Sequence, residues 1–66
     1  MITVLVNNEE HAVSATTLAD LLDELGYGGA RVATALDGVF IPAPGRAAAS
    51  LGAGARVEVV APMPGG

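Results

Sequence analysis

The sequence predicts one α+β domain, in which a mixed sheet of four to five strands packs one face against a single main helix and leads into an extended C-terminal tail. Two observations carry this prediction. Short β-branched runs alternate with glycine, proline and asparagine turn signals, and one segment alone has leucines at helical spacing. A chain of 66 residues can build the core of one domain only.

The first two strands are expected to form a hairpin. Residues 1–6 (MITVLV) are mostly β-branched, and alternate side chains of this run would share one face of a sheet. Asn7 and Asn8 signal a turn, so residues 7–10 are interpreted as the connection to a second strand over 11–14.

The main helix is the most regular element of the sequence. Thr16 or Thr17 can cap its first free N–H groups, and Asp20 places a negative charge in its first turn. Gly26 suits the left-handed position after the helix end. Four leucines form one apolar stripe over about nine residues: Leu18, Leu21, Leu22 and Leu25.

The pattern of the second half of the chain predicts strands joined by tight turns. Asp37-Gly38 is a strong hairpin signal, Pro42 ends the strand that follows it, and residues 46–50 predict a single helical turn. The strands are predicted at 31–36, 39–41 and 56–60.

The order β-β-α-β-β-β with one helix is the pattern of a β-grasp domain. The connection from the first hairpin through the helix to the third strand is long enough for a crossover, which predicts that part of the sheet is parallel. We expect residues 1–60 to form the domain and 61–66 to form a flexible tail.

Composition excludes several classes of function. The chain has no cysteine and one histidine, His11, so thiolate chemistry, disulfides and cysteine- or histidine-rich metal sites are excluded. Seven acidic residues against three arginines give a net charge of −4, which argues against a nucleic-acid or anionic-membrane partner. No apolar run approaches the roughly 20 residues that span a bilayer, and no secretory leader is visible, so we expect a cytoplasmic protein.

The remaining polar side chains predict no catalytic site of their own. His11 is interpreted as a surface residue at a strand edge, because no nucleophile or second ligand accompanies it. The acidic residues of the helix lack calcium-loop spacing and are interpreted as a solvated face: Asp20, Asp23 and Glu24. The three arginines are scattered and are interpreted as surface charges: Arg31, Arg46 and Arg56.

The end of the sequence is its most informative feature. A terminal carboxylate on Gly66, preceded by Gly65, can enter a narrow channel of a partner enzyme because glycine has no side chain. Pro62 and Pro64 favour an extended stem, and Met63 lies between them. A frayed terminus without function is the alternative interpretation.

An apolar surface is expected beside this tail. By strand alternation Leu5 and Val60 point away from the helix, and Phe40 with Met63 would extend the same patch. Such patches often mark partner surfaces. For Phe40, a position capping the core is the alternative.

Five segments carry a resemblance to a known family: 17–22 (TLADLL), 32–38 (VATALDG), 41–42 (IP), the approach from Leu51 to Gly54, and 57–66 (VEVVAPMPGG). Together with the short N-terminal strand and turn, they resemble the ThiS family of sulfur carriers in thiamin thiazole biosynthesis, which have a ubiquitin-like β-grasp fold. The resemblance runs over nearly the whole chain. Many relatives have a basic residue where this chain has Ala43 and an acidic one where it has Ala55.

The resemblance implies a carrier, not an enzyme. A ThiF-type adenylyltransferase would adenylate the Gly66 carboxylate with ATP and magnesium, and sulfur from a cysteine desulfurase would convert it to a thiocarboxylate. A ThiG-type thiazole synthase would then take the sulfur. The resemblance implies that the chain binds no cofactor itself, and we expect a monomer when it is free.

Three other functions remain open from the sequence. A MoaD-type carrier of molybdopterin synthesis shares the fold and tail but is usually longer. A ubiquitin-like modifier would join Gly66 to lysines of target proteins. A small interaction domain would make no use of its last two glycines.

Overall fold

The structure is a computed structural model that describes residues 1–28 and 31–61. Its elements follow the predicted β-β-α-β-β-β order, and the helical turn predicted before the last strand is present as a 3-10 helix, η1. The elements are β1 (Ile2–Val6), β2 (Glu9–Val13), α1 (Leu18–Glu24), β3 (Ala33–Leu36), β4 (Val39–Ile41), η1 (Ala43–Ala48) and β5 (Arg56–Val60).

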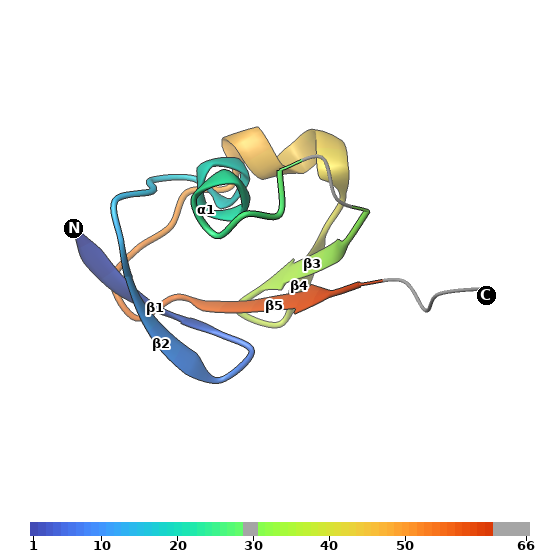
Figure 1. Cartoon of the computed structure of the whole chain (residues 1–66). Helices are drawn as coiled ribbons and strands as arrows, with labels where there is room; N and C mark the ends of the chain where they lie inside the picture. The colour runs from blue at the N-terminus through green and yellow to red at the C-terminus, as the bar shows by residue number, and fades with distance from the viewer. Residues whose placement is uncertain (29–30, 62–66) are drawn as a thin grey trace.

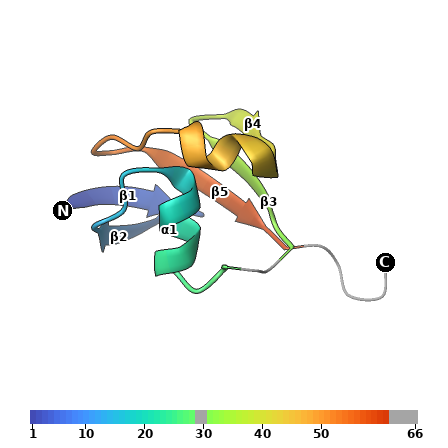
Figure 2. The same ribbon diagram turned by 90° about the horizontal axis from the view of Figure 1, so that it is seen from above.

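The strands form one five-stranded mixed sheet in the order β2-β1-β5-β3-β4. The helices α1 and η1 both lie on one face of it (Figure 1, Figure 2). The predicted mixed sheet is therefore confirmed. Its hydrogen-bonded parallel pair is β1 with β5, whereas β3 runs antiparallel to both of its neighbours. The last strand of the chain thus lies at the centre of the sheet, where both of its edges have a partner.

The first hairpin is tighter than the sequence suggested. Asn7 and Asn8 both have positive φ, 50° and 69°, so the turn closes in two residues instead of four. The second strand therefore begins at Glu9 and ends at Val13, and the predicted range of 11–14 is wrong by two residues at its start and by one at its end. Asparagine tolerates this left-handed conformation better than most residues because its short polar side chain bonds locally.

Helix α1 begins where its capping signal predicts. Thr17 is the N-cap, and its side-chain oxygen accepts a hydrogen bond from the Asp20 amide at 3.2 Å. The helix covers seven residues instead of nine, because Leu25 is already the C-cap and Gly26 follows with φ of 89°. The Glu24 carboxylate accepts from the Ser14 and Ala15 amides, so it ties the helix to the preceding loop and is more than a solvated charge.

The second half differs from prediction in two boundaries. Strand β3 begins at Ala33, not at residue 31, because its partner β5 ends at Val60, which lies opposite Ala33. Helix η1 begins at Ala43 rather than at 46. Pro42 (φ of −69°) is its N-cap, and a second proline in its first turn stabilises the start of the helix. The predicted Asp37-Gly38 turn is confirmed, with φ of 49° and 83°.

The core lies between the sheet and the helices. Leu18, Leu21 and Val4 are fully buried within it, and Leu25 packs against it from the half-exposed helix end. Its buried apolar members are Val4, Val6, Val13, Ala15, Leu18, Leu21, Leu22, Ala55, Val57 and Val59. Each leucine buried in this way contributes about 1.5–3 kcal/mol to folding.

One buried polar group joins η1 to the sheet. Thr34 is 2% exposed, and its hydroxyl donates to the Ile41 carbonyl at 2.8 Å and accepts from Arg46 Nε at 3.0 Å. Arg46 also donates to the Val32 carbonyl. The interpretation of Arg46 as a surface charge is therefore wrong: its guanidinium is half-buried and satisfies groups that would otherwise be unpaired.

Candidate functional site

Strand β5 leads directly to the C-terminal segment. Val57 and Val59 are buried under the helices, whereas Arg56, Glu58 and Val60 are exposed on the opposite face, as the alternation predicts. Ala61 follows the strand and is exposed. The other five residues of the predicted tail lie outside the described residues: Pro62, Met63, Pro64, Gly65 and Gly66. The division into a domain at 1–60 and a tail at 61–66 stays a prediction.

The three predicted docking residues all lie on this outer face. Val60 is 62% exposed and Phe40 is 65% exposed, so the alternative in which Phe40 caps the core is wrong. Leu5 is half-buried. Because β5 and β3 separate β1 from β4, the side chains of Leu5 and Phe40 lie on opposite sides of Val60.

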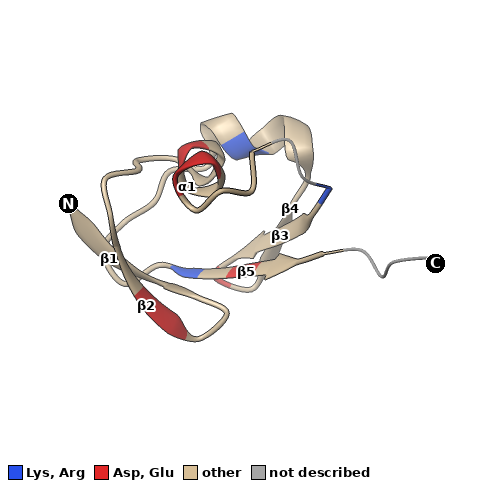
Figure 3. Ribbon diagram, in the orientation of Figure 1, with Lys and Arg blue, Asp and Glu red and all other residues tan. Residues whose placement is uncertain are grey.

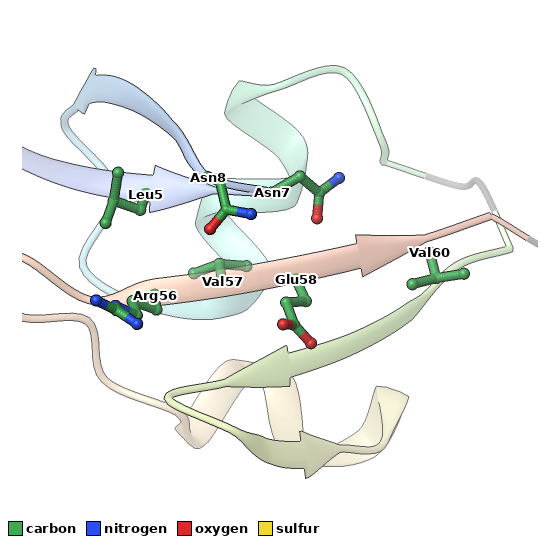
Figure 4. Close-up of a pocket in the computed structure, with 7 residues that line it drawn as sticks. All are labelled: Leu5, Asn7, Asn8, Arg56, Val57, Glu58 and Val60. Atoms are coloured by element: carbon green, nitrogen blue, oxygen red, sulfur yellow. The ribbon is translucent and has the colours of Figure 1, made fainter.

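Val60 connects the hollows of this surface. With Leu5 it borders a hollow over β1 and β5, where Arg56 lies opposite Leu5 and Glu58 lies between Arg56 and Val60 (Figure 4). With Phe40 it borders a second hollow, over β3 and β4. A broader apolar hollow at the root of the tail is also lined by Val60. The docking residues are thus joined through Val60, and the charged Glu58 interrupts the apolar surface between Leu5 and Phe40.

Charges are distributed unevenly over the molecule. Acidic residues lie on α1, on β2 at the first hairpin, at the β3–β4 turn (Asp37) and on β5 (Glu58), while arginines lie on η1, on β5 and before β3 (Figure 3). Within residues 1–28 and 31–61, no three His, Asp or Glu side chains gather closely enough to hold a metal ion. His11 is half-buried on the edge strand β2, beside Leu25 and Tyr27. In the same ranges no helix is long and apolar enough to cross a membrane.

From the sequence, Asn7 was expected only to form a turn, but its side chain also holds the strand that leads to the tail. The Asn7 side chain makes two hydrogen bonds to the backbone of Val59. The Asn-Asn pair indicates a turn in the sequence, but nothing local indicates a partner 52 positions away. The half-buried Arg46 was missed for the same reason, because its acceptors come from β3 and the residue before it.

The central position of β5, with one main helix across one face, defines a ubiquitin-like β-grasp protein. The ThiS family model matches residues 2–66, and the chain belongs to that family. A solved structure of the thiamine biosynthesis protein ThiS from Geobacter metallireducens is similar, with a TM-score of 0.82 and 25% sequence identity over 98% of this chain and 100% of that chain. No curated protein matches the sequence.

The family resemblance expected from the sequence is therefore confirmed. Family membership and this structural likeness support a role as a sulfur carrier in thiamine biosynthesis, with the chain acting as a carrier and not as a catalyst. The cytoplasmic location stays a prediction.

Proposed function

We propose that the Gly66 carboxylate is the sulfur-carrying group and that the sulfur is used to form the thiazole of thiamin. The observation that supports this most directly is the ThiS family match, which extends through Gly65 and Gly66. The chain itself supplies no cofactor. ATP and magnesium belong to the activating enzyme.

The chemistry takes place at the main-chain terminus. A carboxylate oxygen of Gly66 attacks the α-phosphorus of ATP, pyrophosphate leaves, and an acyl adenylate forms on a ThiF-type adenylyltransferase. A persulfide sulfur, supplied by a cysteine desulfurase, attacks the acyl carbon, and AMP leaves with the original oxygen. Reduction of the resulting acyl disulfide by a thiol releases the thiocarboxylate. A ThiG-type thiazole synthase takes that sulfur.

The fold supports this proposal through β5. Hydrogen bonds to β1 and β3 hold this central strand, so the tail begins at a defined place beside an exposed surface. We propose that Met63, Pro64 and Gly65 enter the partner's active site, because glycine next to the reacting carboxylate lets the channel close around the backbone. Leu5, Phe40 and Val60 would form the surface on which the activating enzyme docks.

The proposal is tested by intact mass spectrometry. The purified chain is incubated with a ThiF-type enzyme, ATP, magnesium, a persulfide sulfur source and a thiol that reduces the acyl disulfide. We expect a mass increase equal to the exchange of one oxygen for one sulfur. A chain that lacks Gly66 serves as the control and should keep its mass.

Two results would contradict the proposal. A stable bond between Gly66 and lysines of other proteins would indicate a ubiquitin-like modifier. No change of mass in the intact chain, or the same change after removal of Gly66, would indicate that the terminus carries no sulfur. If sulfur is transferred to a molybdopterin precursor and not to thiazole, a MoaD-type carrier replaces the proposed one.

The docking surface gives a separate prediction. Val60→Asp should raise the KM of the activating enzyme for this chain by on the order of tenfold to a hundredfold and leave kcat nearly unchanged, because a carboxylate would be buried in an apolar contact. Val39→Asp is the matched control: Val39 is 61% exposed, as Val60 is 62%, but lies on the other face of the sheet. Equal effects of the two substitutions on KM would argue against docking at Val60.

A further inference from the structure

The two edges of β5 are held differently near the tail. On one side, pairing with β3 continues to the last residue of the strand, where Ala33 lies opposite Val60. On the other side, the parallel pairing with β1 ends with Val6 opposite Val57. The backbone of β1 cannot follow β5 any further, because the left-handed turn at Asn7 and Asn8 reverses the chain.

The Asn7 side chain continues the pairing that the backbone has left. The Asn7 amide N–H donates to the Val57 carbonyl at 2.9 Å. Beyond this bond, Asn7 Nδ2 donates to the Val59 carbonyl at 3.0 Å, and the Val59 amide donates to Asn7 Oδ1 at 2.9 Å. Through one N–H and its oxygen the carboxamide offers a donor and an acceptor side by side, as a peptide backbone does, so it takes the place of one further residue of β1.

A second turn residue holds the opposite end of β5. Asp37 also has positive φ, 49° against 50° for Asn7, and stands at the start of the β3–β4 turn. The Arg56 amide donates to Asp37 Oδ1 at 3.0 Å. Asp37 therefore holds the first residue of β5, whereas Asn7 holds the residue next to its end.

We propose that Asn7 is a positioning residue for sulfur transfer: its bonds to Val59 fix the direction in which the C-terminal segment leaves the sheet. This inference rests on the proposed function. Val59 lies two residues before Ala61, so Asn7 is the last restraint on the β1 side of β5 before the tail begins, as the described residues show it. Without it, β3 alone holds this end of the strand.

The consequence is kinetic. The activating enzyme would still dock on the outer face, but the Gly66 carboxylate would reach the bound ATP in the reactive position less often. A reaction that depends on the placement of two groups loses rate steeply when one of them is poorly held. We therefore expect kcat to fall and KM to change little, which is the opposite of the effect of a damaged docking surface.

The test compares Asn7→Gly with Asp37→Gly. Each substitution removes a side chain that holds β5, at a position with positive φ where glycine is tolerated. Asn7→Gly removes two side-chain hydrogen bonds and Asp37→Gly removes one, so the melting temperature should fall further in the first variant, and both are assayed well below it. With Asn7→Gly as its substrate, the activating enzyme should catalyse ATP-dependent pyrophosphate exchange with a kcat lower by on the order of tenfold. Asp37→Gly should leave it unchanged. NMR-detected amide exchange should become faster at Val59 in the first variant and at Arg56 in the second.

The outcomes separate this inference from the proposed function. Equal kcat values for the two variants, or a rise in KM without a fall in kcat for Asn7→Gly, would overturn the positioning role. If the activating enzyme shows no pyrophosphate exchange with the wild-type chain, the proposed function is overturned and this inference with it. If Asn7→Gly does not fold, Asn7→Asp replaces it: this variant keeps an acceptor for the Val59 amide but sets a carboxylate oxygen against the Val59 carbonyl in place of the donor, so kcat should again fall and KM should change little.

Discussion

Replacing Leu21 with alanine is expected to cost about 2–5 kcal/mol of stability, the largest effect of any single substitution considered for the domain. Leu21 is fully buried between α1 and the sheet, so the shorter side chain leaves a cavity that the surrounding strands cannot fill. A domain of this length has a free energy of unfolding of roughly 3–10 kcal/mol. The substitution therefore removes a large part of it and lowers the melting temperature by roughly 10–30 °C.

The matched control is Leu25→Ala. Leu25 belongs to the same leucine stripe, but it is the C-cap of α1 and is half-buried, so the same exchange should cost only about 1 kcal/mol. Urea unfolding followed by far-UV circular dichroism measures both variants. A loss of stability in Leu25→Ala as large as that in Leu21→Ala would show that the core does not lie where the structure has it.

Gly65→Val is expected to reduce thiocarboxylate formation by on the order of a hundredfold or more, with no change in the melting temperature. The variant keeps the terminal carboxylate and adds one β-branched side chain beside it. If the channel of the activating enzyme closes around a backbone without side chains, the added methyl groups hold the carboxylate away from ATP. The rate at which the sulfur-containing mass appears measures the effect.

Gly52→Val is the matched control for this prediction. Gly52 is exposed, and a Cβ added there meets no atom within 4 Å, so the same exchange should not disturb the fold. Gly52 is also remote from the tail in sequence. It should form the thiocarboxylate at the wild-type rate. Unimpaired thiocarboxylate formation by Gly65→Val would contradict the proposal that Gly65 enters a narrow site.

Local signals predicted most of the elements because they act between residues that are close in sequence. The Thr17 side chain caps the helix by accepting a hydrogen bond from the amide three residues later. Asp37-Gly38 closes a hairpin by its own backbone conformation. The boundaries were less accurate where a distant partner decides them. Strand β3 begins at Ala33 because β5 ends opposite it, and no pattern within residues 31–36 contains that information.

The candidate site was also predicted where a local pattern was long enough, and left open where it was not. Alternation along β5 placed Val60 outward, and the structure confirms its exposure. The sequence left Phe40 between core and surface, because a three-residue edge strand shows too short a pattern to settle its faces. The pairing of β4 with β3 decides the question: Phe40 lies opposite Ala35 on the outer face.

By itself the sequence determined the class of fold, the leucine stripe that builds the core, and the family, because these depend on local periodicity and on the final segment through Gly66. Only the tertiary structure decided that β5 lies between β1 and β3, and that Asn7 holds Val59 across 52 positions of the chain. The physical reason is that strand pairing and side-chain bonds to the backbone are made between segments far apart in the sequence. Their register follows from how the whole core closes.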